Sequence, residues 1–278
     1  MKVAGLQTDI AWLDPEENFQ RVRQLAETAV SHGARLLVLP EMFATGFSMN
    51  VELLAGWAGK IEGFLQVLAY DLQVFVVGGV ADAAVGRVDR PGRNWALAFD
   101  PDGAVVARYQ KIHPFSYGEE SRHYHGGQAL SGFEADGVYI VPYICYDLRF
   151  PEVFRAAASQ ADLILVIASW PAARRHAWKS LLVARAIENQ CFVLGVNRVG
   201  EGGGLMYQGD SVLLDPLGIE RSQPLVGPGL VEGEVNGPEV QAVRERFPFL
   251  ADRQPTLYAR LLNEAGSGVE RKGDGDTR

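Results

Sequence analysis

Three side chains that are chemically suited to catalysis each follow a short apolar segment. Glu41 comes directly after Leu-Leu-Val-Leu-Pro, Lys111 after Val-Val-Ala-Arg-Tyr-Gln, and Cys145 after Val-Tyr-Ile-Val-Pro-Tyr-Ile. Apolar segments of this length are typical of buried strands, and catalytic groups of α/β folds gather at the carboxyl ends of strands. If the three strands run parallel and close together, we expect their terminal side chains to meet at one edge.

A thiol, a carboxylate and an ammonium group together make a nucleophilic site. A free cysteine thiol, with a pKa of about 8.5, is mostly protonated at neutral pH. A glutamate takes that proton as general base and returns it to a departing amine, while a lysine stabilises the thiolate and the oxyanion of a tetrahedral intermediate. Each residue alone is more often a loop acid, a surface lysine or an inert cysteine. The combination favours a hydrolase with Cys145 as nucleophile, Glu41 as base and Lys111 as electrostatic partner.

The residues around Cys145 indicate a strand that runs into a tight turn and then into a helix opened by Pro151. Hydrolase nucleophiles commonly occupy such positions, because the turn exposes the side chain and leaves the next backbone N–H free to bind an oxyanion. Here that donor is expected to be Tyr146. The alternative is an ordinary loop with a local pair between Asp147 and Arg149.

Arg149 is a candidate for substrate binding. It follows Cys145 by about one helical turn, so its guanidinium is expected to reach back over the pocket. A guanidinium binds a carboxylate through two parallel hydrogen bonds, which suits a short substrate with an amide at one end and a carboxylate at the other. The alternative is a structural salt bridge from Arg149 to Asp147, Glu152 or another acid. In that case three other cations remain as candidates: Arg174, Arg175 and His113.

Strands and helices alternate along the chain. The first helix is expected to start at Asp14 as cap, with Pro15 at its first position, and to end at Gly33. Other helices are expected over 61–72, from Pro151 onward and over 175–190, and a hairpin joins strands 94–99 and 104–110. Further strands are expected over 2–8, 36–39, 74–77, 138–144, 163–168, 191–197, 210–215 and 228–234. This order predicts an α/β fold with mixed sheets covered by helices.

Composition narrows the class of protein. The chain has 278 residues, of which 47% are hydrophobic and 22% charged, as in ordinary globular proteins. A net charge of −8 argues against nucleic acid as a partner. No apolar run approaches the roughly 20 residues of a membrane span, and the N-terminus reads as a strand and not as a signal peptide, so we expect a cytoplasmic protein with no membrane partner. Two cysteines are too few for a disulfide framework, and Cys191 opens an apolar run typical of an inert core residue.

Several motifs resemble those of the nitrilase superfamily of carbon–nitrogen hydrolases. Three of them contain the residues singled out above: Leu-Pro-Glu-Met-Phe-Ala-Thr-Gly-Phe at 39–47, Tyr-Gln-Lys-Ile-His at 109–113 and Ile-Cys-Tyr-Asp-Leu-Arg-Phe-Pro-Glu at 144–152. Ala-Arg-Ala-Ile-Glu-Asn-Gln at 184–190 and Gln-Gly-Asp-Ser at 208–211 are similar to two further family segments. An ordered set of motifs over roughly residues 1–250 is a far more specific signal than one motif alone.

The resemblance implies a four-layer α-β-β-α sandwich, the same Glu–Lys–Cys triad, a homodimer and no cofactor or metal. It places a single domain over 1–265, and the polar, glycine-rich segment 266–278 is expected to be a disordered tail. The family also has a second glutamate near the lysine. Glu119 and Glu120 are both candidates, and Glu120 fits better because Glu-Ser stands seven residues before Gly127, as in related members.

Within the superfamily the sequence is most similar to the ω-amidase branch, which hydrolyses the terminal amide of short 2-oxo dicarboxylic acid monoamides. The marks are Glu-Met-Phe-x-Thr-Gly-Phe at 41–47, Cys-Tyr-Asp-Leu-Arg-Phe-Pro at 145–151 and Ser-Trp-Pro-Ala at 169–172, which makes Trp170 a further candidate for binding the small amide substrate. Pro114 departs from the leucine of many relatives and is expected to alter only a loop near Lys111.

Competing functions have weaker support. His113, His123 and His125 lie near one another, but the sequence has neither Cys-x-x-Cys nor a helical His-x-x-x-His, so loop histidines are favoured over a metal site. Glycines at 200–204 and 78–79 lack the strand–Gly-x-Gly-x-x-Gly–helix context of a nucleotide site. An intact triad argues against a non-enzymatic binding protein. The triad alone does not separate amide hydrolysis from carbamoyl amino acid hydrolysis, nitrile hydrolysis or acyl transfer.

Overall fold

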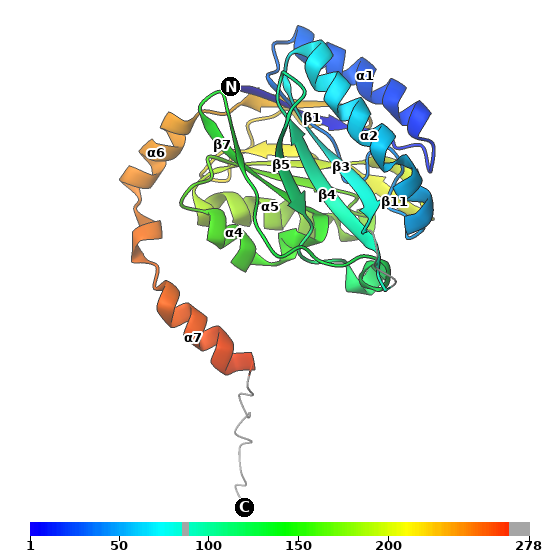
Figure 1. Ribbon diagram of the computed structural model, residues 1–278. Coiled ribbons are helices and arrows are strands. Elements are labelled where there is room, and N and C mark those ends of the chain that lie inside the picture. Colours follow the sequence, from blue (N-terminus) through cyan, green and yellow to red (C-terminus); the bar gives the residue numbers. More distant parts are fainter. Residues whose placement is uncertain (85–88, 267–278) are drawn as a thin grey trace, which may run out of the picture.

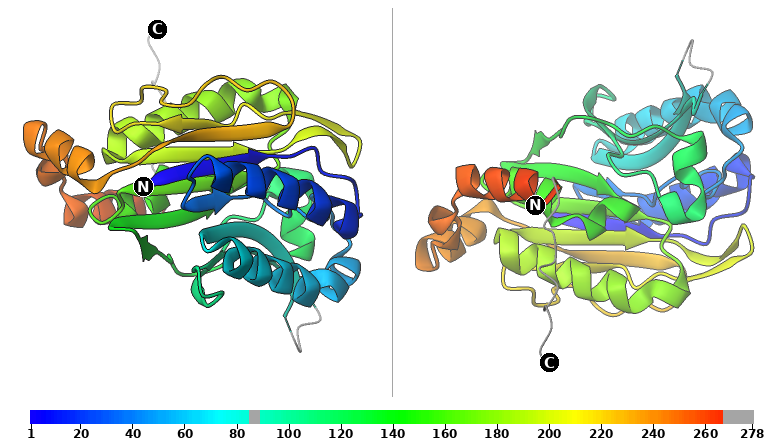
Figure 2. Two further views of the ribbon diagram at one scale, coloured as in Figure 1. Left: turned by 90° about the horizontal axis from the view of Figure 1, so that it is seen from above. Right: turned by 90° about the horizontal axis from the view of Figure 1, so that it is seen from below.

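The computed structural model describes residues 1–84 and 89–266. Two β-sheets pack face to face, and helices cover the outer side of each (Figure 1, Figure 2). This arrangement is the four-layer α-β-β-α sandwich that the resemblance to the nitrilase superfamily implies, and it confirms the mixed sheets covered by helices that the order of elements predicts. Within the described ranges, no helix is both long and apolar enough to cross a membrane.

The first sheet has six strands in the order β13-β1-β2-β3-β4-β5. These are β1 (Lys2–Gln7), β2 (Leu36–Val38), β3 (Phe75–Ala83), β4 (Gly92–Phe99), β5 (Val105–Gln110) and β13 (Gly229–Glu234). Strands β1, β2 and β3 run parallel, and β4 is antiparallel to both β3 and β5. Strand β5 therefore runs in the same direction as β2, so the residues that follow these two strands reach the same edge of the sheet.

The second sheet has five strands in the order β12-β9-β8-β7-β6. These are β6 (Phe133–Ala135), β7 (Val138–Ile144), β8 (Leu163–Ala168), β9 (Phe192–Asn197) and β12 (Val212–Leu214). Strands β7, β8 and β9 are parallel, and all residues of β8 and β9 are buried, as expected for strands covered on both faces. A separate hairpin joins β10 (Val199–Gly202) to β11 (Leu205–Gln208).

Each sheet is covered by its own pair of helices. Helices α1 (Pro15–Ser31) and α2 (Val51–Leu72) lie on the first sheet, and α4 (Pro151–Ala157) and α5 (Arg175–Asn189) on the second (Figure 1, Figure 2). Helix α1 begins as predicted, because the Asp14 carboxylate accepts a hydrogen bond from the Glu17 N–H at 3.1 Å. Helices α6 (Gly237–Arg246) and α7 (Pro255–Gly266) extend away from the sandwich (Figure 1).

Some elements differ from the sequence-based expectation. Helix α2 begins at Val51 and not at residue 61, because Asn50 caps it and Val51 and Leu54 are buried at its start. Glycines at 56, 59 and 63 lower the helix propensity of this segment and interrupt its helical pattern of apolar residues. Strands β6, β10 and β11 and helices α6 and α7 were not predicted. Of the expected tail 266–278, Gly266 is the last residue of α7, and 267–278 lie outside the described residues.

A glycine in β1 lets the first sheet lie directly against a side chain of the second sheet. A Cβ placed on Gly5 of β1 lies 2.7 Å from Cγ2 of Val196 on β9, well inside normal van der Waals contact. The surrounding core is built from the buried apolar residues of both sheets. Any side chain at position 5 therefore pushes the two sheets apart.

We predict that Gly5→Val lowers the melting temperature by several degrees, because overpacking a close-packed core costs about 1–3 kcal/mol. Gly63→Ala is the matched control. A Cβ at Gly63 meets nothing within 4 Å, and alanine favours a helix more than glycine does, so this variant is expected to be slightly more stable than wild type. Thermal unfolding of both variants checks the pair. Equal melting temperatures would mean that the two sheets move apart at no cost.

Candidate active site

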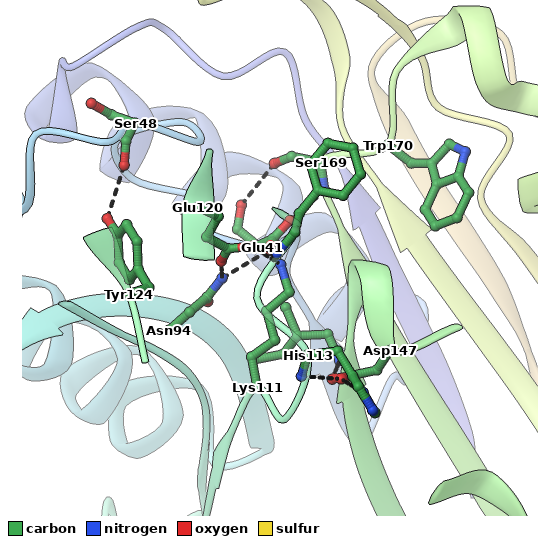
Figure 3. Close-up of polar contacts among 12 residues, drawn as sticks. Glu41, Ser48, Asn94, Lys111, His113, Glu120, Tyr124, Asp147, Ser169 and Trp170 are labelled. Atoms are coloured by element: carbon green, nitrogen blue, oxygen red, sulfur yellow. Dashed lines mark hydrogen bonds and ion pairs between the residues drawn. The ribbon is translucent and has the colours of Figure 1, made fainter. Parts of the chain in front are cut away.

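Three of the residues singled out from sequence lie together as a buried ionic cluster. The Lys111 ammonium lies 2.9 Å from Glu41 Oε1 and 2.8 Å from Glu120 Oε2, and none of the three side chains is more than 1% exposed (Figure 3). Glu119, the other candidate, is exposed and bonded to Arg122. Glu120 is therefore the second carboxylate beside Lys111.

The strands that position these groups belong to both sheets. Glu41 follows β2 and Lys111 follows β5, two strands of the first sheet that run in the same direction. Cys145 follows β7 of the second sheet. The simple expectation of three parallel strands meeting at one sheet edge therefore holds for Glu41 and Lys111, whereas Cys145 reaches the site from the facing sheet.

A glycine in β3 lets the Glu41 segment lie against the sheet. A Cβ at Gly79 would lie 2.4 Å from the backbone nitrogen of Met42 and 2.7 Å from Glu41 Cα. Met42 itself has a positive φ of 46°, so the chain turns sharply just after Glu41. Close approach and a sharp turn together direct the Glu41 carboxylate inward to Lys111.

Cys145 occupies a strained turn between β7 and the short helix η2 (Cys145–Arg149). Its φ of 45° lies in the left-handed region that side-chain-bearing residues rarely adopt. The same geometry is found where hydrolases present a nucleophile from a strand-to-helix turn. The side chain is partly exposed, whereas Cys191 is buried. Cys145 is thus displayed at the surface of a cavity, and Cys191 is a core residue.

Asp147 joins the turn after Cys145 to the segment that carries Lys111. Its Oδ2 accepts hydrogen bonds from the Ile144 N–H at 3.1 Å and the Tyr109 hydroxyl at 2.8 Å. Its Oδ1 accepts the His113 N–H at 3.0 Å and contacts His113 Nδ1 at 2.9 Å (Figure 3). Because Tyr109 and His113 flank Lys111, one buried carboxylate sets the position of Lys111 relative to the cysteine turn.

The electrostatics of the cluster depend on burial and on opposite charges. Burial opposes the charge of Lys111, but the carboxylates of Glu120 and Glu41 outweigh it and hold the pKa of Lys111 well above its usual value. Burial, and then the Glu41 carboxylate, raise the pKa of the Cys145 thiol, while Lys111 and the Ser169 backbone N–H act in the opposite direction. The thiol consequently keeps its proton at neutral pH, and a base is needed to remove it.

A cavity of about 740 Å³, including its open mouth, lies beside Cys145. Its walls come from several loops and from the β10–β11 hairpin, and they contain Phe47, Met49, Phe115, Gly118, Cys145, Tyr146, Arg149, Ser169, Trp170, Pro171, Arg174, Gly203, Leu205 and Tyr207. All three predicted substrate-binding residues, Tyr146, Arg149 and Trp170, are among them. The hairpin residues were missed from sequence, because the glycines at 200–204 indicate only a turn.

The arginines near the site differ in whether they already form an ion pair with an acidic side chain. Arg149 is exposed at the cavity, with its guanidinium 5.0 Å from the Trp170 ring, and Arg174 lies 5.1 Å from the Phe115 ring. Within residues 1–84 and 89–266, neither arginine forms an ion pair, so the alternative salt bridge of Arg149 to Asp147 or Glu152 is not formed. Arg175 is instead bound to Asp210 through two hydrogen bonds of 2.9 and 2.6 Å.

The histidines considered as metal ligands lie in separate surroundings. His113 contacts Asp147 and stacks on Phe150 at 3.8 Å, and His125 Nδ1 lies 3.2 Å from the Arg90 carbonyl. In the part of the chain that the structure describes, no group of three or more His, Cys, Asp or Glu side chains is placed to hold a metal ion.

Comparisons with known proteins agree with this geometry. The sequence profile of the carbon–nitrogen hydrolase family matches residues 2–245. The chain is 39% identical to the omega-amidase YafV of Yersinia enterocolitica, over 92% of this chain and 98% of that protein. It is 34% identical to the 2-oxoglutaramate amidase of Bacillus subtilis, with the same coverage of 92% and 98%.

Solved structures give the same result. A CN-hydrolase superfamily protein from Xanthomonas campestris, with an arsenic adduct in its active site, superposes with a TM-score of 0.84 at 33% identity over 91% of this chain and 97% of that chain. A mutant amidase from Nesterenkonia sp. AN1, with the acetamide moiety of fluoroacetamide covalently added at its active-site cysteine, has a TM-score of 0.82 at 28% identity over 94% and 96% of the two chains. With its fold, its buried cluster and these similarities, the chain belongs to the carbon–nitrogen hydrolase family.

Proposed function

We propose that this protein is an ω-amidase that hydrolyses the terminal amide of small ω-amido dicarboxylic acids, 2-oxo acids included, and releases ammonia. The observation that carries the proposal is the division of charge around the cavity. Cys145 stands beside the buried carboxylate–ammonium cluster, and Arg149 and Arg174 line the same cavity without an acidic partner among the described residues. The relatives named omega-amidase and 2-oxoglutaramate amidase support the same substrate class.

The first half of the reaction forms a thioester. Glu41 removes the Cys145 proton, and the thiolate attacks the amide carbon to give a tetrahedral oxyanion. The Lys111 ammonium and the Tyr146 backbone N–H stabilise that oxyanion. The carbon–nitrogen bond then breaks, Glu41 returns the proton to the departing nitrogen, and ammonia leaves with the acyl group bound to sulfur.

The second half regenerates the enzyme. Water enters beside the thioester, and Glu41 takes its proton as hydroxide adds to the carbonyl carbon. The carbon–sulfur bond breaks, the thiolate recovers a proton from Glu41, and the dicarboxylic acid leaves. Because water is the only co-substrate, the reaction requires no cofactor. A thiol nucleophile works only while reduced, so we also place the protein in a reducing compartment, the cytoplasm.

Glu120 acts through Lys111 and not on the substrate. Its Oε2 accepts hydrogen bonds from the Lys111 ammonium at 2.8 Å and from the Phe115 backbone N–H at 2.6 Å. This second bond attaches the cluster to the loop that forms one wall of the cavity. We therefore assign Glu120 as a positioning residue, which orients the lysine toward the reacting carbonyl.

Two guanidiniums bind the far carboxylate of the substrate. Arg149 lies over the face of Trp170, whose indole N–H is already bonded to the Arg174 carbonyl at 2.8 Å. Trp170 therefore contributes an apolar surface for the methylene chain of the substrate, and its hydrogen bond holds the backbone that carries Arg174. A carboxylate between Arg149 and Arg174 gains charge-assisted hydrogen bonds that an uncharged amide lacks.

Cys145→Ala is predicted to abolish turnover, because no thioester forms. Mass spectrometry of wild-type enzyme quenched with substrate should show an acyl adduct on the peptide that contains Cys145. Cys191→Ala is the control: this residue is fully buried and burial raises its pKa to about 12, so near-native turnover is expected. Near-native activity of Cys145→Ala would contradict the thioester mechanism.

Glu41→Gln is predicted to lower kcat by about 10²–10⁴-fold through loss of the general base. Lys111→Ala is predicted to lower it roughly 10²–10³-fold through loss of oxyanion stabilisation. Glu120→Gln should lower activity more than Glu119→Gln, because only Glu120 contacts Lys111. Steady-state kinetics on variants with native circular dichroism check these values. Full kcat in the Glu41 and Lys111 variants would remove both from the mechanism.

Arg149→Met and Arg174→Met are each predicted to lower kcat/KM for succinamate by roughly 10–100-fold, since a charge-assisted hydrogen bond contributes about 1.5–3 kcal/mol. Activity on butanamide, which lacks the carboxylate, should change little. Arg175→Met is the matched control, because Asp210 already holds Arg175 outside the cavity lining. Equal losses on both substrates together with a lower melting temperature would indicate that the two arginines are structural.

A further inference from the structure

Asn94 contacts three charged residues of the site, although no sequence motif singles it out. It lies on β4 and is 2% exposed. Its amide nitrogen donates to Glu41 Oε1 at 2.8 Å and to Glu120 Oε1 at 3.0 Å (Figure 3). Its backbone carbonyl accepts the Lys111 N–H at 2.8 Å. One side chain thus bridges both carboxylates, and its backbone anchors the lysine between them.

The orientation of the amide is set by these bonds. The Asn94 Oδ1 atom is buried and has no hydrogen-bond partner in the described part of the protein. Turning the amide over would place that oxygen against two carboxylates and leave the NH₂ group without an acceptor, which is less favourable. The NH₂ group is therefore kept toward the glutamates, at the expense of an unsatisfied oxygen on the other side.

The cluster needs such a donor because its charges do not balance. Glu41 and Glu120 are two carboxylates that share a single ammonium. Burial raises the pKa of Glu120, Lys111 lowers it, and the Glu41 carboxylate raises it further. A neutral amide that donates one hydrogen to each carboxylate favours the charged form of both without adding another charge. An ionised Glu41 is the form that accepts the Cys145 proton.

We propose that Asn94 is a positioning residue of the reaction, whose amide keeps Glu41 and Glu120 ionised and aligned so that Glu41 acts as the base toward Cys145. The proposal rests on the proposed function for its kinetic test. The hydrogen bonds themselves do not depend on which amide is the substrate.

Few other groups at the cluster change charge between about pH 5 and 8. Lys111 stays protonated, and burial raises the pKa of Cys145 and of Tyr124, and that of Tyr207 to about 12. His113, bound to Asp147 beyond Lys111, is the same in every variant compared. The cavity also holds the guanidiniums of Arg149 and Arg174, which are the same in every variant compared. Differences between variants in the pH dependence of kcat/KM over this range therefore reflect the two glutamate carboxylates.

The direction of the expected shift follows from the role of the donor. Activity falls on the acid side once the carboxylate cluster takes up a proton, because a protonated carboxyl group cannot act as the base. Removal of hydrogen bonds to a carboxylate raises its pKa, so the acid limb of kcat/KM should move to higher pH in Asn94→Ala, by roughly one unit. Asn94→Asp replaces the donor with a third acid and should move the limb further.

The experiment measures kcat/KM for succinamate against pH in wild type, Asn94→Ala, Asn94→Asp and the milder Asn94→Ser. Asn189→Ala is the matched control: Asn189 is equally buried and also has an unpartnered oxygen, but it donates only to the Arg185 carbonyl in α5. The acid limb of the kcat/KM profile of Asn189→Ala should stay at the pH of wild type even if the melting temperature of this variant falls. If the Ala and Asp variants do not fold, Asn94→Ser decides the question, with a smaller shift in the same direction.

A second readout needs no substrate. Infrared difference spectra, with Glu41→Gln and Glu120→Gln to assign the bands, follow protonation of the two carboxylates against pH. In Asn94→Ala the protonated carboxyl band should appear at higher pH than in wild type. An unmoved acid limb and an unmoved band would overturn the role of Asn94. No turnover of ω-amido acids by wild type, with the band shifted as expected, would overturn only the proposed function.

Discussion

The ammonium of Lys111, shared by Glu41 and Glu120 in a nearly dry interior, is the interaction on which the site depends. Burial of a single charge is strongly unfavourable, and it is tolerated here because each charged oxygen finds a donor. The Ser169 N–H bonds to Glu41, the Phe115 N–H bonds to Glu120, and Asn94 bonds to both. Loss of Lys111 would leave two buried carboxylates without a counter-charge. This requirement explains why segments far apart in the chain all converge on one small volume.

The two-sheet architecture supplies the reactive pair from opposite sides. Strands β2 and β5 deliver the carboxylate and the ammonium, and β7 delivers the thiol from the facing sheet. The buried core between the sheets keeps the groups in register, and Asp147 links the two sides directly through Tyr109, His113 and Ile144. The distance between nucleophile and cluster is thus determined by sheet packing and by one carboxylate, and not by flexible loops.

Specificity has a different structural origin. The cavity walls come from the segment after Glu41, the loop before α3 (Glu120–His123), the turn η2, the segment around Trp170 and the β10–β11 hairpin. These segments lie outside the two large sheets, and Phe115 and Ser169 among them contact the cluster through their backbone N–H groups. In this chain the walls carry the guanidiniums of Arg149 and Arg174 and several apolar side chains.

The sequence by itself determined most of the strands and the fact that Glu41, Lys111 and Cys145 follow three of them, because apolar periodicity and turn chemistry are local properties. It also placed the cap of α1 at Asp14. Only the tertiary structure decided that Cys145 approaches from the second sheet, that Glu120 is buried while Glu119 is exposed, and that Asn94 joins the cluster. It also decided that Asp210 holds Arg175 while Arg149 and Arg174 face the cavity. Partners such as Asn94 and Glu41 are 53 residues apart, and the pairing of long polar side chains depends on sheet order and packing, which no local pattern encodes.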